Sequence, residues 1–235
     1  MEVCVEAVTS PVRLGEGPHW DEEEQALYFV SIFDRTIHKY LPADNTHTTA
    51  TLDGMPTFII PVEGKKHHFV VGLDRRVVEV HWSGEHDAAT VLRTIATVDE
   101  HSPDNRLNDA KADPRGRLFA GNPRLIFKYS DHGLKGIVDG MTIDTDGNLW
   151  VANFDNYQVI KIDPRAGEIL QTVRMPALQV TSATWGGRGR GQLYVTSAAL
   201  QRAPAPAPPA PPAGATFRVS GLGARGHGNA NVRLD

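Results

Sequence analysis

Three short segments place carboxylate or amide side chains in Gly-rich or apolar surroundings. They are Leu14–Trp20, which contains Glu16; Asn105–Asp113, which contains Asn108; and Ile137–Asp144, which contains Asp139. Carboxylate and amide oxygens bind hard divalent cations, and a carboxylate can also accept a proton from an attacking water molecule. Taken singly, each segment could equally be a polar turn.

The spacing relates the three segments to one another. Glu16, Asn108 and Asp139 precede the leucines of three similar apolar runs, at positions 27, 118 and 149, by 11, 10 and 10 residues. Equivalent positions in successive blades of a β-propeller face the central channel. We therefore expect the three side chains to face a common axis, close enough to share an ion or its ligand.

The strands that must position these residues recur along the chain. Similar apolar, aromatic runs lie at 26–30, 67–71, 117–120, 148–152 and 192–196. Alternating apolar and polar residues at 36–40, 76–80 and 158–162 indicate half-buried strands that follow some of these runs. A few antiparallel strands repeated about every 40 to 50 residues are typical of propeller blades. The predicted fold is therefore an all-β propeller.

One repeat is too short. Matched positions in successive runs are separated by 41, 50, 31 and 44 residues, and the step of 31 is shorter than a blade. This predicts that chain has been lost between Gly121 and Asp139. We place the missing blade near 121–125, within a single domain that spans 1–235. The Pro/Ala-rich stretch 202–213 is expected to be a surface loop, because proline fixes the backbone and removes hydrogen-bond donors.

Composition narrows the function. The net charge of −4 gives no basic excess for nucleic acid, and no apolar run is long enough to span a membrane. The first ten residues lack the basic region of a signal peptide, and Cys4 is the only cysteine. We expect a cytoplasmic monomer without disulfides. The ten histidines are scattered, and we interpret them as surface or core residues.

The chain resembles the regucalcin/SMP-30 family, which includes gluconolactonases and luciferin-regenerating enzymes. The motifs that carry the resemblance follow one another in order at Leu14–Trp20, Arg106–Arg117, Asp139–Asp144, Asp146–Ala152, Thr181–Gly187, Leu193–Ala198 and Phe217–Gly223. The resemblance implies a six-bladed propeller, with about five blades represented here. It also implies one divalent metal ion, Ca²⁺ or one of Zn²⁺, Mn²⁺ and Mg²⁺, in the central channel.

The same resemblance assigns roles to individual residues. Glu16 and Asp139 are expected to bind the metal, and Asp139 to act as the general acid and base. Arg106 and Asn108 are expected to contact the substrate, a sugar lactone. The implied function is a metal-dependent lactone hydrolase of the gluconolactonase type and a calcium-binding, regucalcin-like protein.

The missing stretch departs from the family pattern. In the family it supplies about one blade, together with the metal-binding Asn and a further substrate-binding acid. We therefore expect reduced or no lactonase activity. Two alternatives remain: a non-catalytic calcium-binding regulatory protein on the same scaffold, and a propeller that binds protein partners.

Overall fold

The computed structural model describes residues 2–85, 88–98, 106–112, 115, 117–119, 129–200 and 212–234. The chain divides into two compact units, which we describe separately. Unit 1 comprises Met1–Gly15 and Asn122–Gly228, and unit 2 comprises Glu16–Gly121 and Asn229–Asp235. The predicted position of the missing blade, near 121–125, and most of the Pro/Ala-rich stretch 202–213 lie outside the described residues. The single domain and the monomer stay predictions.

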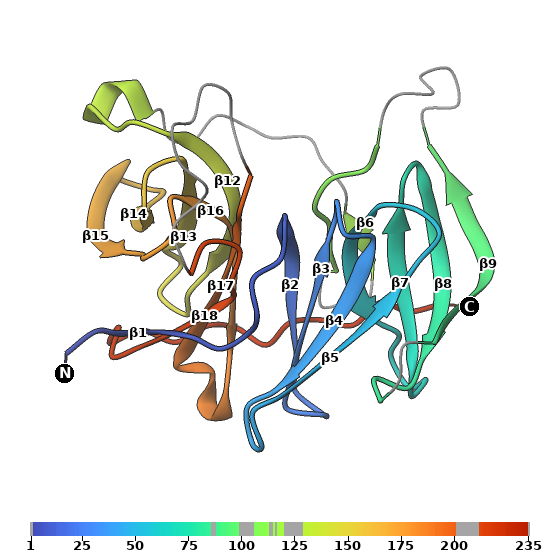
Figure 1. The fold of residues 1–235 in the computed structure, drawn as a ribbon. Coiled ribbons are helices and arrows are strands. Elements are labelled where there is room, and N and C mark those ends of the chain that lie inside the picture. The colour runs from blue at the N-terminus through green and yellow to red at the C-terminus, as the bar shows by residue number, and fades with distance from the viewer. Residues whose placement is uncertain are drawn as a thin grey trace. The chain divides into compact units, whose positions relative to one another are not determined.

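Unit 2 contains two antiparallel four-stranded sheets, each a meander of consecutive strands (Figure 1). The first consists of β2 (Gly15–Asp21), β3 (Ala26–Ser31), β4 (Thr36–Leu41) and β5 (Thr46–Thr51). The second consists of β6 (Pro56–Pro61), β7 (His68–Leu73), β8 (Arg76–Trp82) and β9 (Ala89–Thr97). A two-stranded sheet of β10 (Lys111–Ala112) and β11 (Leu118–Phe119) follows.

Unit 1 contains two further four-stranded sheets. One is the meander β12 (Ile137–Ile143), β13 (Leu149–Phe154), β14 (Gln158–Asp163) and β15 (Glu168–Arg174). The other has the order β1-β18-β17-β16 and is built from β16 (Gln179–Gly186), β17 (Gln192–Ala198), β18 (Phe217–Ser220) and β1 (Cys4–Ala7). The N-terminal strand thus covers the edge of β18, which would otherwise expose unpaired backbone groups. Two short 3-10 helices, η1 (Tyr129–His132) and η2 (Arg188–Arg190), complete the described elements.

The repeated runs in the sequence became equivalent strands. The five apolar, aromatic runs correspond to β3, β7, β11, β13 and β17, which are the second strands of their sheets. The three alternating segments became β4, β8 and β14, the third strands. The all-β prediction and the repeat unit are therefore confirmed. Among the described residues, no helix is long and apolar enough to cross a membrane.

The core lies between neighbouring sheets within each unit. In unit 1, Trp150 of β13 packs edge-to-face on Trp185 of β16, with ring centroids 5.2 Å apart. In unit 2, Tyr28 of β3 packs on Phe69 of β7, with centroids 4.9 Å apart. Large aromatic residues therefore fill the space between the sheets, as the aromatic runs in the sequence predict.

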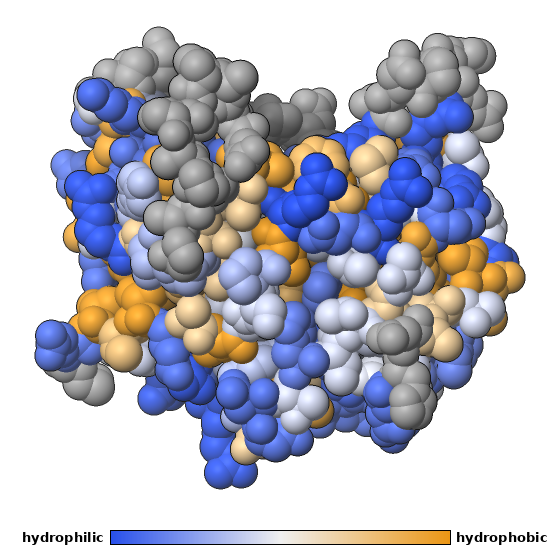
Figure 2. Space-filling view, viewed as in Figure 1, coloured by the Kyte–Doolittle hydropathy of each residue, from blue (hydrophilic) through white to orange (hydrophobic). Residues whose placement is uncertain are grey.

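The first strands of the four-stranded sheets differ in burial. Every residue of β2, β6 and β16 is buried. In β12, by contrast, four large apolar side chains are 41% to 55% exposed: Ile137, Val138, Met141 and Ile143. Elsewhere, on the face seen in Figure 2, hydrophobic side chains reach the surface in small patches among hydrophilic ones. A first strand with this much exposed apolar surface lacks the cover that its equivalents have.

Candidate functional site

Glu16 is the second residue of β2 and is only 7% exposed. The backbone N–H of Gly17 donates to its Oε2 at 3.3 Å. Gly17 has a φ of 53°, and a Cβ at this position would lie 2.9 Å from the Cα of Phe58 in β6. Only glycine permits both this backbone conformation and this close approach of β2 to β6. The Gly-rich motif therefore fixes the backbone that carries Glu16.

Arg106 and Asn108 lie in the segment that leads into β10. The Nη1 of Arg106 donates to the backbone oxygen of Leu107 at 2.9 Å and to the Oδ1 of Asn108 at 3.1 Å. The backbone N–H of Leu107 donates to the oxygen of Asp74 at 2.8 Å, which attaches the segment to the turn between β7 and β8. The guanidinium thus orients the exposed amide of Asn108, so that its Nδ2 remains as a donor.

A lysine joins the first two motifs within unit 2. The Nζ of Lys111 donates to the backbone oxygen of Pro18 at 3.0 Å, two residues after Glu16. His19, the next residue, contacts Asn231 through its Nε2, with 3.1 Å between that atom and the Oδ1 of Asn231. Burial, together with the charge of Lys111, lowers the pKa of His19 to about 3, against an opposing effect of Asn231. His19 is therefore neutral at pH 7 and is not the acid or base of this site.

Asp139 lies on β12, at an irregularity where the pairing with β13 shifts register between Val138 and Met141. Its side chain is half-buried, and the N–H of Gly140 donates to its Oδ1 at 3.1 Å. Burial raises the pKa of Tyr129 in η1, and the negative charge of Asp139 raises it further. Asp139 thus acts electrostatically on a phenol of the same unit.

Gly140 brings β12 against β16. A Cβ at Gly140 would lie 2.9 Å from the Cα of Ser182 and closer still to the Ser182 side chain, so a larger residue would push the strands apart. The Ser182 hydroxyl is fully buried and has no hydrogen-bond partner among the described residues. Such a group costs about 1 to 3 kcal/mol unless a ligand or water satisfies it.

The neighbouring residue of β16 holds the chain just before Glu16. The Thr181 hydroxyl donates to the backbone oxygen of Gly15 at 2.6 Å and lies 2.9 Å from the hydroxyl of Thr196. Within unit 1, the residue before Glu16 and the residue after Asp139 therefore both pack against two consecutive residues of one buried strand, Thr181 and Ser182. We did not predict a role for this pair, although two hydroxyls within a wholly buried strand are a recognisable signal.

The donor set can be compared with what a metal requires. Glu16 and Asp139 offer carboxylate oxygens, which suit hard cations such as Ca²⁺ and Mg²⁺. In the part of the chain that the structure describes, no group of three or more His, Cys, Asp or Glu side chains is arranged to hold a metal ion. The residues present thus fit an ion that keeps part of its water shell rather than one held entirely by protein. Glu16 belongs to unit 2 and Asp139 to unit 1, so their sharing of one ion stays a prediction.

The profile of the SMP-30/Gluconolactonase/LRE-like region matches residues 14–134 and 121–199. The chain belongs to this family. The two matches meet at 121–134, in the stretch where the repeat spacing predicts lost chain. That region therefore interrupts the family pattern, as the sequence predicts.

Individual relatives agree over nearly the whole chain. Regucalcin from Gallus gallus is 28% identical and is aligned over 95% of this chain and 96% of its own length. Regucalcin from Homo sapiens is 27% identical over 91% and 93% of the two chains. The alignment with the Gallus gallus protein spans 304 positions, more than the 235 residues of this chain. The relative therefore has residues that this chain lacks.

Solved structures agree with the predicted fold class. A luciferin-regenerating enzyme has a TM-score of 0.91 and 31% identity, covering 99% of this chain and all of the other. Regucalcin from Agrobacterium tumefaciens, a calcium-binding protein, has a TM-score of 0.82 and 18% identity, covering 98% of both chains. The second similarity shows the fold alone. Together with the repeated four-stranded meanders, these similarities confirm the all-β, propeller-type fold.

Proposed function

We propose that this protein binds a divalent cation through Glu16 and Asp139 and hydrolyses sugar lactones slowly. One observation supports the pairing most directly. Thr181 holds Gly15, directly before Glu16, while Ser182 packs against Gly140, directly after Asp139. Two adjacent residues of one rigid, buried strand thus anchor both carboxylate-bearing segments, which is the kind of support that functional groups require.

Each residue has a defined role in this proposal. A bound divalent cation would polarise the lactone carbonyl and stabilise the negative charge that develops on its oxygen. Asp139 accepts a proton from the attacking water, and the N–H of Gly140 holds its carboxylate in place. Arg106 and the Nδ2 of Asn108 donate to the sugar hydroxyls and so fix the position of the ring.

Slow turnover follows from what this chain lacks. Family resemblance assigns a metal-binding Asn to the missing stretch, and loss of a supporting group typically lowers metal affinity by about 10- to 100-fold. The exposed apolar side chains of β12 also leave the strand that carries Asp139 open to water. This exposure favours a second candidate function, in which the protein binds Ca²⁺ without catalysing hydrolysis.

The first experiment measures cation binding and lactone hydrolysis in parallel. Ca²⁺, Mg²⁺, Mn²⁺ and Zn²⁺ are titrated calorimetrically, and hydrolysis of δ-gluconolactone is followed with each ion. We expect Glu16→Gln and Asp139→Asn each to weaken cation binding by at least about tenfold. Asp146→Asn, which removes an exposed carboxylate in the turn after β12, is the matched control.

The outcomes separate the candidates. Cation binding with turnover well below the usual range of about 1 to 1000 per second supports the proposal. Cation binding without any turnover above the uncatalysed rate selects the regulatory candidate. Binding that is insensitive to both carboxylate variants excludes the proposed site, and turnover within the usual range excludes the expected impairment.

A second experiment tests the anchoring by β16. Thr181→Val removes the hydroxyl that holds Gly15 while keeping the shape of the side chain. We expect weaker cation binding with little change in the thermal unfolding midpoint. Thr172→Val, on the exposed side of β15, is the matched control. Unchanged cation affinity in Thr181→Val would mean that this strand does not position Glu16.

A further inference from the structure

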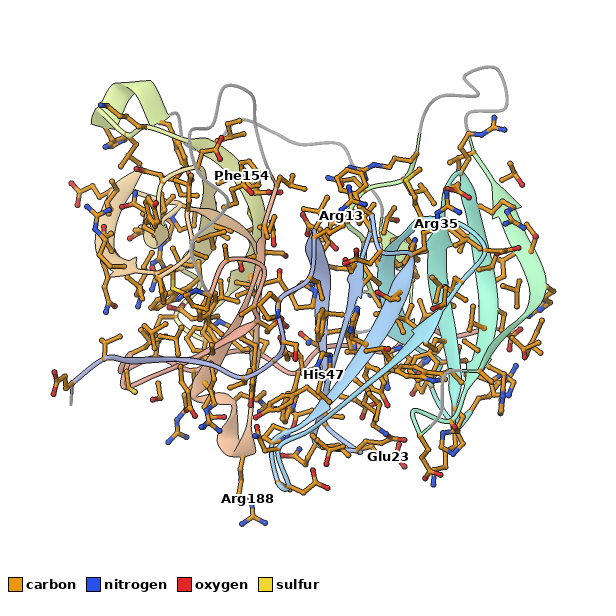
Figure 3. The ribbon with its side chains drawn as sticks, viewed as in Figure 1. Arg13, Glu23, Arg35, His47, Phe154 and Arg188 are labelled. Carbon is orange, nitrogen blue, oxygen red and sulfur yellow. The ribbon has the colours of Figure 1, made fainter. Side chains whose placement is uncertain are left out.

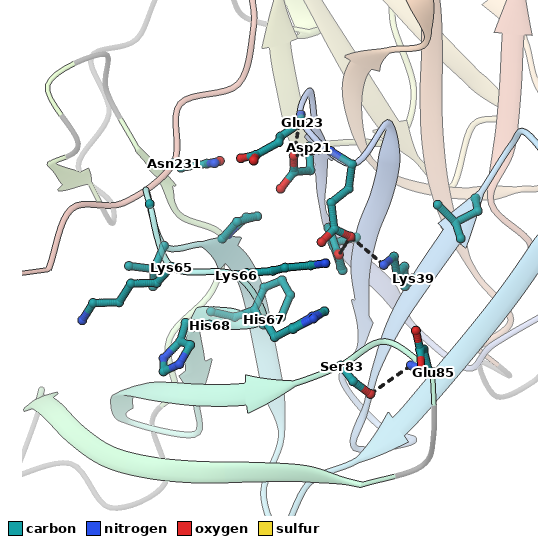
Figure 4. Close-up of a pocket in the computed structure, with 17 residues that line it drawn as sticks. Asp21, Glu23, Lys39, Lys65, Lys66, His67, His68, Ser83, Glu85 and Asn231 are labelled. Carbon is teal, nitrogen blue, oxygen red and sulfur yellow. Dashed lines mark hydrogen bonds and ion pairs between the residues drawn. The ribbon is translucent and has the colours of Figure 1, made fainter.

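Unit 2 contains a polar cavity at the end of β2 opposite to Glu16 (Figure 4). Its volume is 530 Å³, within the range of small-molecule sites. Asp21, the last residue of β2, lines it, and five strand residues separate Asp21 from Glu16, or roughly 17 Å. The cavity is therefore distinct from the proposed lactonase site.

Two turns of opposite charge face this cavity. The turn between β2 and β3 contributes Asp21, Glu23 and Glu24, and Figure 3 shows Glu23 at that end of the sheet. The turn between β6 and β7 contributes a basic run from Lys65 to His68. A cavity with carboxylates on one wall and ammonium groups on the other suits a ligand that carries both charges.

Asp21 is the unusual group on the acidic wall. It is only 7% exposed, and its Oδ1 accepts the backbone N–H groups of Glu23 and Glu24 at 2.8 and 3.1 Å. No described residue forms a hydrogen bond or an ion pair with its Oδ2. Burial raises the pKa of Asp21 above its ordinary value, although the two N–H groups oppose that effect. The carboxylate is therefore incompletely compensated.

The equivalent aspartate of unit 1 shows what Asp21 lacks. Asp144 ends β12 as Asp21 ends β2, and its Oδ2 accepts the Nζ of Lys161 and the Nε1 of Trp150, both at 3.0 Å. The corresponding side chains of unit 2 are Lys39 and Tyr28. Both donate instead to Glu24, at 2.6 and 2.8 Å. Glu24 thus takes the cation that its repeat equivalent gives to the aspartate.

A matching positive group stands on the opposite wall. Lys66 is exposed at its base, and Figure 4 shows its side chain extending into the cavity. Within the described ranges, Lys66 forms no ion pair. The next residue, His67, has a φ of 63°, a conformation that costs energy for a residue other than glycine. Such conformations cluster at ligand-binding turns, and this one shapes the turn that carries Lys66.

We infer that this cavity binds a small zwitterion, with its ammonium group on Asp21 and its carboxylate on Lys66. The ammonium group supplies the positive charge that Lys161 supplies to Asp144. The carboxylate supplies the partner that Lys66 lacks. The ligand class is thus an amino carboxylate, and the site is independent of the proposed lactonase chemistry.

The test uses 4-aminobutanoate as the probe and the full chain as the protein. Binding is measured by calorimetry and by ligand-observed NMR, with butanoate and butylamine as probes of single charge. We expect the zwitterion to bind at least about tenfold more tightly than either control, because each lost charged contact weakens affinity by about that factor or more.

Two variants assign the contacts. Asp21→Asn keeps an oxygen for the turn N–H groups and removes the negative charge, and Lys66→Gln changes an exposed side chain. Each is expected to weaken 4-aminobutanoate binding at least about tenfold. Glu22→Gln, in the same turn but outside the cavity, and Asp139→Asn, in the proposed lactonase site, should bind the probe like the original chain.

Several outcomes would overturn the inference. One is failure of 4-aminobutanoate to bind at millimolar concentration. Another is equally tight binding of butanoate, butylamine or the uncharged polyol glycerol, which would show that the two charges are not recognised together. Loss of binding in Asp139→Asn with retention in both cavity variants would assign the probe to the other site.

Discussion

The sheets β2–β5 and β12–β15 are two versions of one plan. The shared features, unit 2 first, are a carboxylate on the first strand (Glu16, Asp139), an aspartate at its end (Asp21, Asp144), an aromatic residue on the second strand (Tyr28, Trp150) and a lysine on the third (Lys39, Lys161). In both sheets the lysine Nζ lies over the aromatic ring, 5.7 and 5.3 Å from its centroid. The sequence repeat thus became a structural repeat in detail.

The two sheets differ in cover and in charge pairing. The first strand is fully buried in one sheet and exposes apolar side chains in the other. The lysine pairs with a glutamate in one sheet and with the aspartate in the other. The comparison shows that the repeat fixes the backbone and the side-chain positions, while the neighbouring chain determines what each position does.

The largest expected difference concerns the residue before each aspartate. Trp20 is 1% exposed and the equivalent Ile143 is 43% exposed. We expect Trp20→Ala to lower the free energy of unfolding by about 4 kcal/mol, because it leaves a large cavity. Ile143→Ala should cost less than about 1 kcal/mol, because little buried area is lost. Urea unfolding followed by tryptophan fluorescence and circular dichroism compares them. A large cost for Ile143→Ala would mean that β12 is covered after all.

The next difference concerns the two aspartates. Asp144→Asn leaves Lys161, whose side chain is 14% exposed, without its ion-pair partner. We expect a loss of about 3 kcal/mol in the free energy of unfolding, as for other broken buried pairs. Asp21→Asn removes no ion pair and keeps an acceptor for the turn, so we expect less than about 1 kcal/mol. Equal losses in the same unfolding assay would contradict the difference in pairing.

The same two residues should respond to pH with opposite sign. Burial raises the pKa of Asp144, but hydrogen bonds from Trp150 and other donors and the contact with Lys161 lower it overall. Its stabilising contribution is therefore complete above the ordinary value near 3.8 and is lost as the pH falls through the lower folded-state value. The stability advantage over Asp144→Asn should shrink in acid.

Asp21 has the opposite shift, because burial raises its pKa. The original chain should gain stability relative to Asp21→Asn as the pH falls through the raised value toward the ordinary one near 3.8. Unfolding free energies measured from pH 3 to pH 7 give both slopes. Slopes of the same sign would show that Lys161 and its absent counterpart do not control the two carboxyl groups.

Much of this molecule could be predicted from the sequence. The period of the apolar runs gave the strands, and the step of 31 residues located the interruption that the family comparison also shows. The anchoring role of Thr181 and Ser182 was not predicted, because it depends on which strand lies under Gly15 and Gly140. The cavity was missed for a similar reason. Whether Lys39 pairs with Asp21 or with Glu24 depends on turn geometry, which the alternation of residues does not specify.

The smallest expected effect tests that last point. Glu24→Gln removes the negative charge that holds Lys39, so Lys39 becomes available to Asp21 as Lys161 is to Asp144. We expect the pKa of Asp21 to fall, because an added positive neighbour favours the charged carboxylate. The free energy of unfolding should change by no more than about 0.5 kcal/mol, since one partly exposed ion pair replaces another.

The side-chain carboxyl of Asp21, observed by carbon NMR across the pH range, reports this change directly. Glu22→Gln is the control, since it removes a charge from the same turn without releasing Lys39. If the pKa of Asp21 stays raised in Glu24→Gln, burial alone sets it and the lysine does not move to the aspartate. If it falls, one glutamate separates the two versions of the repeat, and the same variant should also weaken zwitterion binding because Asp21 then has its own cation.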